Sequence, residues 1–513
     1  MSDSETMRSG TLVDPQTRID ADQVAALHQA SMAILDDPGI TCLNERAADL
    51  LDEAGCRVTP GPESGPRAWQ IRFPEKVIHD ALEKVPGRVV LGAREPSQRL
   101  VLDTEVPQVY FGTGSETNIF LRSELAEFAR VDGDERLTHP VFIPERGSLQ
   151  RLCQAAKLCN GLDNVDFYIR NVNVQDEDID DDNKDVNVFL AALTHMTRHV
   201  QAGLANVDKL DDVIKLGQLV AGGAEQFERN PVLSFITCLV KSPLQMVDDT
   251  TEKLIAIASR GLPVVISSSP QGGSTAPILE EGMVAQINAE ILAGMTLAQV
   301  VRPGTPVLYG AVPVRARLDT LHDLYGAPEF IHYNVDCVQM ARHYGVPCYS
   351  TAGVGDAQVP GMQATVEKLF PYLGVAGSGA QYVHYAFGLL DKTNVFCPLQ
   401  AVLDDAHIGI VRQILRRPVF DADSAQDAVG EVRKVMKSAT RLYARHIRKA
   451  MRKGLVSPPY AFETSEPCDE VMIRAQQRLE ELLAAGGDPL PPEKLDRIRD
   501  QVPGVLPADR FQP

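Results

Sequence analysis

Small polar residues recur directly after short apolar runs along this chain of 513 residues. The cluster SSSPQGGST at 267–275 follows the apolar run 263–266, and GTGSETN at 112–118, RNVN at 170–173 and STAGVGDAQ at 350–358 stand in similar positions. Buried polar groups of this kind need partners. The pattern therefore predicts a cavity that holds a polar ligand, built where strands end.

Aromatic residues gather at the same places, although they make up only 6% of the chain. They are Tyr110, Phe111, Tyr309, Tyr349, Tyr382, Tyr385 and Phe396. Ring faces suit a quaternary ammonium ion, which donates no hydrogen bond and is held by cation–π attraction. Asp356 and Glu116 would add negative potential. The alternative is that some of these rings only pack the interior.

Other patterns are weaker signs of chemistry. The pairs Gly112/Gly114 and Gly377/Gly379 do not complete GxGxxG and have no following Lys-Ser/Thr, so they indicate turns more than a nucleotide site. The segment THMTRH spaces His195 and His199 like metal ligands but lacks the glutamate of HExxH, which favours core or surface histidines.

No metal site is expected elsewhere. The acidic run 176–185 lacks the glycine and terminal glutamate of a calcium loop and is typical of a solvated loop. Nine scattered cysteines without a CxxC pair indicate reduced thiols, and we expect Cys348 and Cys397 to be packed rather than reactive.

A strand-then-helix rhythm must position these residues. Apolar strand candidates are 109–112, 166–172, 200–205, 232–238, 263–267, 306–310, 347–351 and 375–377. Helical segments between them are 148–159, 185–197, 207–221, 249–259, 284–300, 328–344 and 362–373. Eight such units favour an α/β fold of the closed (β/α)8 barrel type. An open doubly wound sheet is the competing fold.

The sequence also predicts a division into four parts. Residues 1–18 are expected to be a disordered lead-in, 19–105 a mainly helical extension, 106–416 the barrel, and 417–513 a helical extension with a Pro-rich tail. The C-terminal helices would pack on the barrel or on a second subunit, so a homo-oligomer is expected.

Composition limits the partners. A formal net charge of −19 disfavours nucleic acid. No stretch approaches the roughly 18 apolar residues of a membrane span, and the N-terminal residues have no apolar signal core. We therefore expect a cytoplasmic protein without a membrane partner.

Five segments taken together resemble one known family. They are FPEKVIHDALEKVPGRVVLGAR at 73–94, GTGSETN at 112–118, the long stretch 267–310, YGVPCYSTAGVGDAQVPGMQATVEK at 344–368 and FGLLDKTNVFCPLQAVLDDAHIGIVRQIL at 387–415. Over about residues 20–416 the chain is similar to the trimethylamine methyltransferase (MttB-type) superfamily, in the branch without pyrrolysine that includes glycine betaine:corrinoid methyltransferases.

The resemblance implies a (β/α)8 barrel that moves a methyl group from an amine to the Co(I) of a separate corrinoid protein. The corrinoid would arrive with that partner, and no tightly bound cofactor is expected. The founding branch carries pyrrolysine, whose counterpart here would lie among residues 353–358, and its absence favours a quaternary amine such as glycine betaine. Loss of methyl from a quaternary nitrogen leaves a neutral amine, so positioning and electrostatics suffice without a general acid.

The resemblance also suggests roles for residues. Asp356 and His384 are the expected catalytic residues, with Asp356 beside the ammonium group. Substrate-binding residues would be Phe111, Glu116, Arg170, Asn171, Ser268, Gln271, Ser274, Tyr309, Tyr349 and Tyr382. Of the polar residues, Arg170, Asn171, Gln271 or His384 would take a betaine carboxylate. Transfer to a folate and a non-catalytic betaine-binding barrel are the alternatives.

Overall fold

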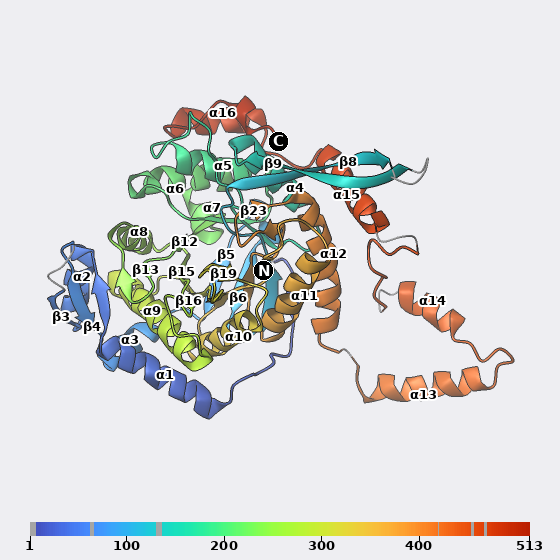
Figure 1. The fold of residues 1–513 in the computed structure, drawn as a ribbon, viewed down its shortest axis with the longest axis horizontal. Coiled ribbons are helices and arrows are strands. Elements are labelled where there is room, and N and C mark those ends of the chain that lie inside the picture. Colours follow the sequence, from blue (N-terminus) through green and yellow to red (C-terminus); the bar gives the residue numbers. More distant parts are fainter. Residues whose placement is uncertain (1–6, 62–65, 130–135, 419, 453–455, 466–468) are drawn as a thin grey trace.

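A single curled sheet forms the centre of the computed structural model, which describes residues 7–61, 66–129, 136–418, 420–452, 456–465 and 469–513 (Figure 1). Its strand order is β1-β7-β21-β20-β17-β15-β12-β11-β10. The strands are β1 (Thr11–Leu12), β7 (Gln108–Phe111), β10 (Phe167–Ile169), β11 (His199–Ala202), β12 (Leu233–Thr237), β15 (Val264–Ser268), β17 (Val307–Ala311), β20 (Cys348–Thr351) and β21 (Tyr382–His384). All neighbours from β7 to β10 are parallel, and only β1 is antiparallel.

The first and last parallel strands of the sheet order, β7 and β10, approach each other. Gly112, just after β7, forms a parallel bridge with Phe167 at the start of β10. The backbone N–H of Asp166 also donates to the carbonyl of Phe111 at 2.7 Å. The sheet is therefore strongly curved, and the end of β7 meets the start of β10.

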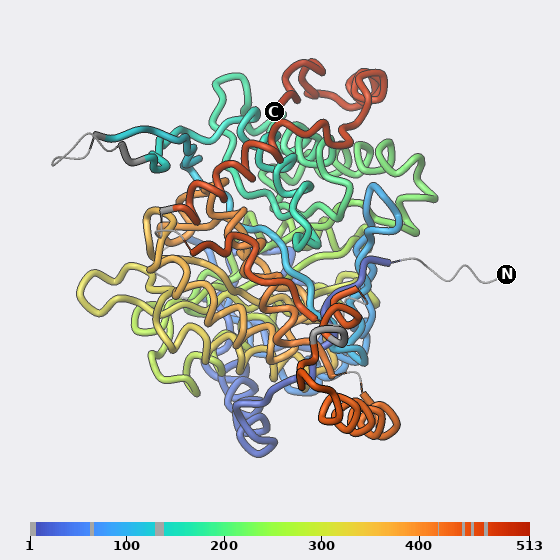
Figure 2. The backbone as a smooth tube through the Cα atoms, turned by 90° about the vertical axis from the view of Figure 1, so that its right-hand side faces the viewer, coloured from blue at the N-terminus to red at the C-terminus, as the bar shows by residue number. Residues whose placement is uncertain are grey.

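A helix follows each of the eight parallel strands and covers the outer face of the sheet (Figures 1 and 2). In chain order they are α4 (Leu149–Gly161), α5 (Lys184–His195), α6 (Leu210–Ala221), α8 (Asp248–Ser259), α9 (Glu280–Val301), α10 (Pro328–His343), α11 (Met362–Gly377) and α12 (Pro398–Leu415), with the short α7 (Ala224–Arg229) after α6. Proline at the first position starts α10 and α12, where its missing N–H costs no hydrogen bond.

Helix α9 is longer than the predicted helical segment 284–300, and it is strongly apolar. Among the described residues it is the one helix long and apolar enough to cross a membrane by length and composition. However, 89% of its apolar window is buried inside the protein. It packs on β15 and β17 and against α8 and α10, as the central helix of a folded core does.

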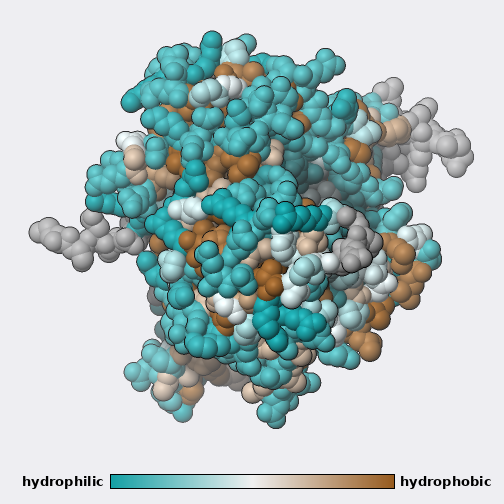
Figure 3. All heavy atoms as spheres, turned by 90° about the vertical axis from the view of Figure 1, so that its left-hand side faces the viewer, coloured by the Kyte–Doolittle hydropathy of each residue, from teal (hydrophilic) through white to brown (hydrophobic). Residues whose placement is uncertain are grey.

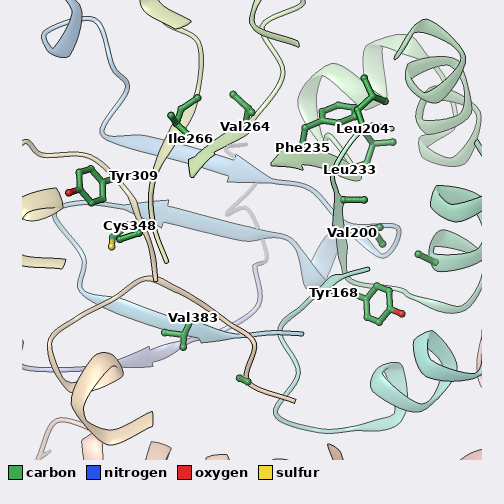
Figure 4. Packing of buried hydrophobic residues seen from close by; sticks show 14 of the residues in the cluster. Tyr168, Val200, Leu204, Leu233, Phe235, Val264, Ile266, Tyr309, Cys348 and Val383 are labelled. Atoms are coloured by element: carbon green, nitrogen blue, oxygen red, sulfur yellow. The ribbon is translucent and has the colours of Figure 1, made fainter. Parts of the chain in front are cut away.

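Successive strand residues point to opposite faces of the sheet, and this divides the core in two. Val264, Ile266, Tyr309, Cys348 and Val383 belong to the outer cluster, between sheet and helices (Figure 4). Val265, Leu308, Tyr349 and Tyr382 belong to the inner cluster. The hairpin of β5 (Arg88–Leu91) and β6 (Leu100–Asp103) also packs into the inner cluster.

The eighth strand was predicted in the wrong place. Residues 375–377 are the last turn of α11, and the strand is β21, five residues further on. A short apolar run at a buried helix end has the same composition as a buried strand, so periodicity does not separate them. The other seven predicted strands overlap observed ones.

The N-terminal part lies against one side of the sheet assembly. It contains α1 (Ala21–Asp36), α2 (Glu45–Glu53) and α3 (Glu75–Leu82), followed by the 3-10 turn η1 (Pro96–Gln98). A small sheet joins β13 (Val240–Lys241), β14 (Gln245–Met246), β2 (Ile40–Cys42), β4 (Trp69–Arg72) and β3 (Arg57–Pro60). Its outer side is mainly hydrophilic with small apolar patches (Figure 3).

The disorder expected for residues 1–18 does not hold where the structure describes the chain. Thr11–Leu12 forms β1, and Arg8 pairs with the buried Asp166. Residues 1–6 lie outside the described part. The pairing of β1 with β7 gives this segment backbone partners that its polar composition did not indicate.

Short strands and a long hairpin complete the loops after the parallel strands. They are β8 (Ile119–Ala129), β9 (Arg136–Arg146), β16 (Gln271–Gly272), β18 (Val314–Ala316), β19 (Asp323–Leu324), β22 (Leu389–Leu390) and β23 (Val395–Phe396), with the 3-10 turn η2 (Val207–Lys209). The β8–β9 hairpin projects from the body, and α15 (Asp469–Ala484) packs along it (Figure 1).

The C-terminal part divides into packed and projecting helices. Beside α15, α16 (Pro492–Gln501) and η3 (Ala508–Phe511) lie on the body, whereas α13 (Ala422–Met436) and α14 (Ala444–Arg452) form an arm that extends away from it (Figures 1 and 2). Exposed apolar residues on this arm are Val429, Val432, Met436, Ile447 and Met451.

Candidate active site

Two residues at the carboxyl end of β12 that share the inward parity are accessible to solvent. Ile236 packs with the inner cluster yet is only half-buried. Cys238, just beyond β12, is accessible to solvent although protein surrounds it closely enough to raise the pKa of its thiol. Exposure of inward-facing residues at this depth indicates space at the mouth of the curled sheet, the usual site of chemistry in parallel α/β folds.

His384, on the inner face of β21, is the most constrained polar residue in this region. Its ring stacks on Tyr349 at 3.9 Å between centroids and 19° between planes, and the edge of Tyr385 contacts it at 3.9 Å. Nε2 lies 2.7 Å from the Thr351 hydroxyl, whereas Nδ1 has no partner among the described residues. Complete burial lowers the pKa of His384 well below its usual range, so the imidazole is neutral near pH 7.

The stack continues through two more rings. Tyr382 lies 5.8 Å from Tyr349 and stacks on Phe167 at 3.5 Å and 10°. Burial raises the pKa of Tyr382, so its hydroxyl is protonated, and the described residues offer that hydroxyl no hydrogen-bond partner. Strands β10, β20 and β21 thus supply one continuous aromatic wall. The predicted grouping of Tyr349, Tyr382 and His384 is what the structure brings together.

Ser268 of β15 does not face the inner side of the sheet, whereas its neighbour Ser267 does. Ser267 follows the inward Val265 by two residues and has no partner in the described chain apart from a weak contact with the Cys238 thiol. Ser268 points to the outer face and donates to Glu290 of α9. The assignment of Ser268 to the ligand was wrong by one residue, because alternate strand residues face opposite sides.

Tyr309 and Phe111 are two further wrong predictions of the same kind. The Tyr309 hydroxyl donates to Asn288 of α9 at 2.9 Å on the outer face. Phe111 packs edge-on against Tyr372 at 6.3 Å, with the Arg412 guanidinium 5.4 Å from its ring centre. Both rings belong to the layer between sheet and helices, so they do not face the inner side of the sheet.

The loops after β15, β17 and β20 place three predicted residues differently. Gln271 donates to Asp323 at 2.6 Å and is half-buried. Ser274 is exposed in the turn that follows, and its predicted contact with a ligand stays a prediction. Asp356 accepts the backbone N–H groups of Tyr325 at 3.1 Å and Gly326 at 2.8 Å. Burial raises the pKa of Asp356, and these hydrogen bonds partly offset the rise.

A charged group lies at the ends of β7 and β10. The buried Arg170 pairs with Glu116, which also lies 3.4 Å from the Lys184 ammonium. Asn171 accepts from the Tyr168 hydroxyl at 2.6 Å. Nη1 of Arg170 and Nδ2 of Asn171 are buried and have no acceptor within the described residues. Two unused donors of this kind are suited to an anionic group.

The remaining candidates behave mostly as expected. His195 bonds the Phe511 carbonyl at 2.8 Å, and His199 bonds Gly92 and Ser234, so both are satisfied core histidines. Burial raises the pKa of the Cys348 and Cys397 thiols to about 12. The acidic run is less solvated than predicted, because Asp185 is buried and accepts two backbone N–H groups.

The predicted site residues left out several inward residues, although some lie in the predicted site segments: Phe167, Gln201, Cys238, Ser267 and Thr351. Gln201, like Ser267, has a buried oxygen without a partner in the described part of the chain. The alternation of side chains along a strand could have identified some of them, since inward residues of one strand are separated by an even number of positions.

The structure therefore has an α/β fold with an aromatic wall on the inner face of its curled sheet. Comparison then gives the family. The family model described as trimethylamine methyltransferase (MTTB) matches residues 6–453, so the chain belongs to this family and is a methyltransferase.

Two similar relatives are informative. The trimethylamine methyltransferase MttB1 of Methanosarcina mazei is 27% identical over 417 residues, which cover 80% of this chain and 79% of the relative. The glycine betaine methyltransferase of Desulfitobacterium hafniense is 26% identical over 482 residues, covering 93% and 94%. Similarity to the second relative extends further along the chain.

Proposed function

We propose that this protein transfers a methyl group from a quaternary amine, glycine betaine or a similar betaine, to the Co(I) of a corrinoid protein. The observation that carries the proposal is the wall of Phe167, Tyr382, Tyr349 and His384, together with the unused buried donors of Arg170 and Asn171 just after β10. The long match to a relative named glycine betaine methyltransferase agrees with it.

The wall suits the ammonium end of such a substrate. Aromatic faces attract a cation that has no hydrogen to donate. A neutral His384 does not repel that cation, which is why its lowered pKa matters. The reacting methyl would point toward the open mouth, where Cys238 is accessible.

The opposite end of a betaine is a carboxylate, and Arg170 and Asn171 are suited to it. Each has a buried N–H without an acceptor in the described residues. Glu116 fixes the Arg170 side chain through an ion pair and leaves Nη1 free. The aromatic wall would bind the positive end of the substrate, and Arg170 and Asn171 its negative end. This favours a betaine, which carries both charges, over trimethylamine.

Catalysis would then rest on placement. The leaving group is a neutral tertiary amine, so no residue has to protonate it, and the protein holds the nitrogen and excludes water. A corrinoid carried by a partner protein would supply the Co(I) nucleophile at the mouth. Asp356 is a positioning residue in this scheme, because its carboxylate is engaged by the backbone at residues 325–326.

The proposal includes the closure of the sheet as a (β/α)8 barrel. The Gly112–Phe167 bridge and the eight strand–helix units support it. We assign residues 106–416 to this barrel, with 19–105 and 417–513 as extensions. The apolar residues on the α13–α14 arm favour a homo-oligomer, which light scattering of the full chain would test.

The direct test incubates purified protein with glycine betaine and chemically reduced cobalamin. We expect methylcobalamin and dimethylglycine in equal amounts, and a raised KM in Arg170→Gln. Tyr309→Phe is the control, since its hydroxyl faces away from the inner side of the sheet. Formation of methyltetrahydrofolate instead would identify a folate acceptor. Tight betaine binding without turnover by either acceptor would contradict methyl transfer from betaine.

A further inference from the structure

Three of the chain's eleven histidines meet at one place away from the candidate active site. His28 lies on α1, His79 on α3 and His343 at the end of α10, and Glu75 of α3 lies among them. Helices α1, α3 and α10 lie on the same side of the molecule (Figure 1). The ring centroids of His79 and His343 are 5.6 and 5.5 Å from that of His28.

The atoms of this cluster converge without bonding one another. Nε2 of His28 lies 3.9 Å and Nε2 of His79 3.5 Å from Oε1 of Glu75. All three atoms are within 4.8 Å of one another. Distances of this size are too long for good hydrogen bonds. They are close to the separation of about 3.4 Å between ligands of a tetrahedral zinc ion with bonds of about 2.1 Å.

The pair between His332 of α10 and Glu280 of α9 has a different geometry. Nδ1 of His332 lies 2.7 Å from Oε1 of Glu280, in direct hydrogen-bond contact. There one imidazole meets one carboxylate. In the cluster several imidazoles surround one carboxylate at a wider spacing, which leaves room for a cation between them.

His28 is oriented as a metal ligand usually is. Its Nδ1 lies 3.0 Å from the Tyr344 hydroxyl, and that hydroxyl accepts from Asn288 at 2.9 Å. The ring is thereby fixed with Nε2 toward Glu75, as outer partners fix ligating histidines. Only 10% of the His28 side chain is exposed. Glu75 and His79 are about half exposed and free to adjust.

We propose that His28, Glu75 and His79 bind one divalent transition-metal ion, with zinc as the ion that two imidazoles and one carboxylate favour. His343 or a water molecule would take the fourth position. The spacing of Glu75 and His79 by four residues puts both on one face of α3. No sequence motif indicates this site, because His28 lies on α1 while Glu75 and His79 lie on α3.

The position indicates a structural role. His343 ends α10 shortly before β20 begins, so the site is near the amino ends of the strands, opposite the candidate active site. A metal here would fasten α1 and α3 to α10. Binding of an ion to the folded chain alone raises stability by mass action.

The test uses full-length protein stripped with a chelator and titrated with zinc by calorimetry, with metal content measured after dialysis. We expect one equivalent bound and a rise in the midpoint of thermal unfolding. Glu75→Gln and His79→Ala should each weaken binding at least about tenfold and abolish the rise. His332→Ala, which removes a histidine of the same helix α10, should leave both unchanged.

A methyl-transfer assay tests the metal site and the proposed function separately, since His79→Ala should retain the activity of the unaltered protein. No zinc binding by the unaltered chain would overturn the proposal, and so would equal binding by both ligand variants. Both variants carry changes at half-exposed side chains, so loss of folding is not expected.

Discussion

The inner and outer faces of the curled sheet are both buried and both carry hydroxyls, rings and charges, yet they differ in one respect. On the outer face Ser268, Tyr309 and Glu290 have hydrogen-bond partners. On the inner face Ser267, Tyr382 and His384 each have an atom without one in the described residues. Native proteins rarely leave buried polar atoms unpaired. In this comparison the unpaired atoms lie on the inner face, although Thr296 and His407 in the helix layer also have an atom without a partner in the described residues.

The comparison predicts that outer-face changes act on stability and inner-face changes on activity. The largest effect is expected for Asp404→Ala. The Asp404 carboxylate lies 3.0 Å from the Lys368 ammonium, and both side chains are fully buried. Gly388 and Gln400 also donate to it. Its removal leaves an unpaired buried charge and should lower the free energy of unfolding by about 3–5 kcal/mol.

Chemical denaturation followed by circular dichroism measures this loss. The control is Glu481→Ala, which breaks the exposed pair with Arg478 and should cost less than about 1 kcal/mol. A similar, small cost in both variants would show that the buried pair does not support the outer layer.

The second prediction concerns pH. Burial raises the pKa of Asp405 from 3.8 to about 6, although the Asn164 backbone N–H donates to it at 2.8 Å. The folded protein therefore keeps a proton that the unfolded chain loses between these values. The contribution to stability is full below about pH 4 and is lost as pH rises through 6, by up to about 3 kcal/mol.

Unfolding measured in steps from pH 4 to pH 7 checks this slope. Asp405→Asn, which does not titrate, should flatten it. A slope that is unchanged in Asp405→Asn would assign the pH dependence to another group.

These differences also explain what the sequence could predict. Seven of the eight parallel strands were located to within a few residues, since apolar runs followed by helical periodicity are a local signal. The face of each strand residue was not predicted, and a shift of one position moves Ser268 to the helices and Ser267 to the inner face. The β8–β9 hairpin was missed because its strands, at residues 119–129 and 136–146, lack a strong alternation of apolar and polar residues.

Contacts between residues far apart in the chain leave no local pattern in the sequence and could not be predicted from it. The Arg170–Glu116 ion pair joins residues 54 positions apart, and the partner of Tyr309 lies on α9. Which groups remain unpaired depends on all such contacts together. Tyr349, Tyr382 and His384 lie together as predicted, although their contact with substrate stays a prediction, while Phe111 and Tyr309 face outward.

The third prediction uses the neighbouring serines. Ser268→Ala removes a donor to the buried Glu290 and should cost about 2 kcal/mol of stability, because hydrogen bonds to charged groups are strong. Ser267→Ala removes a hydroxyl that makes no strong hydrogen bond within the described residues, so it should change stability by less than about 0.5 kcal/mol. Thermal unfolding of both variants, with methyl-transfer rates beside it, tests the difference. Equal costs would contradict the division of the two faces.

The last and smallest effect compares two tyrosines of neighbouring layers. Tyr309→Phe breaks a hydrogen bond to Asn288 and should cost about 1 kcal/mol without changing KM for the amine. Tyr382→Phe removes a hydroxyl without a partner in the described chain, so stability should be equal or slightly higher. If that hydroxyl bonds the substrate, KM should rise several-fold in Tyr382→Phe alone. An unchanged KM would mean that Tyr382 contributes only its ring face, and the unpaired oxygen would then not mark a substrate contact.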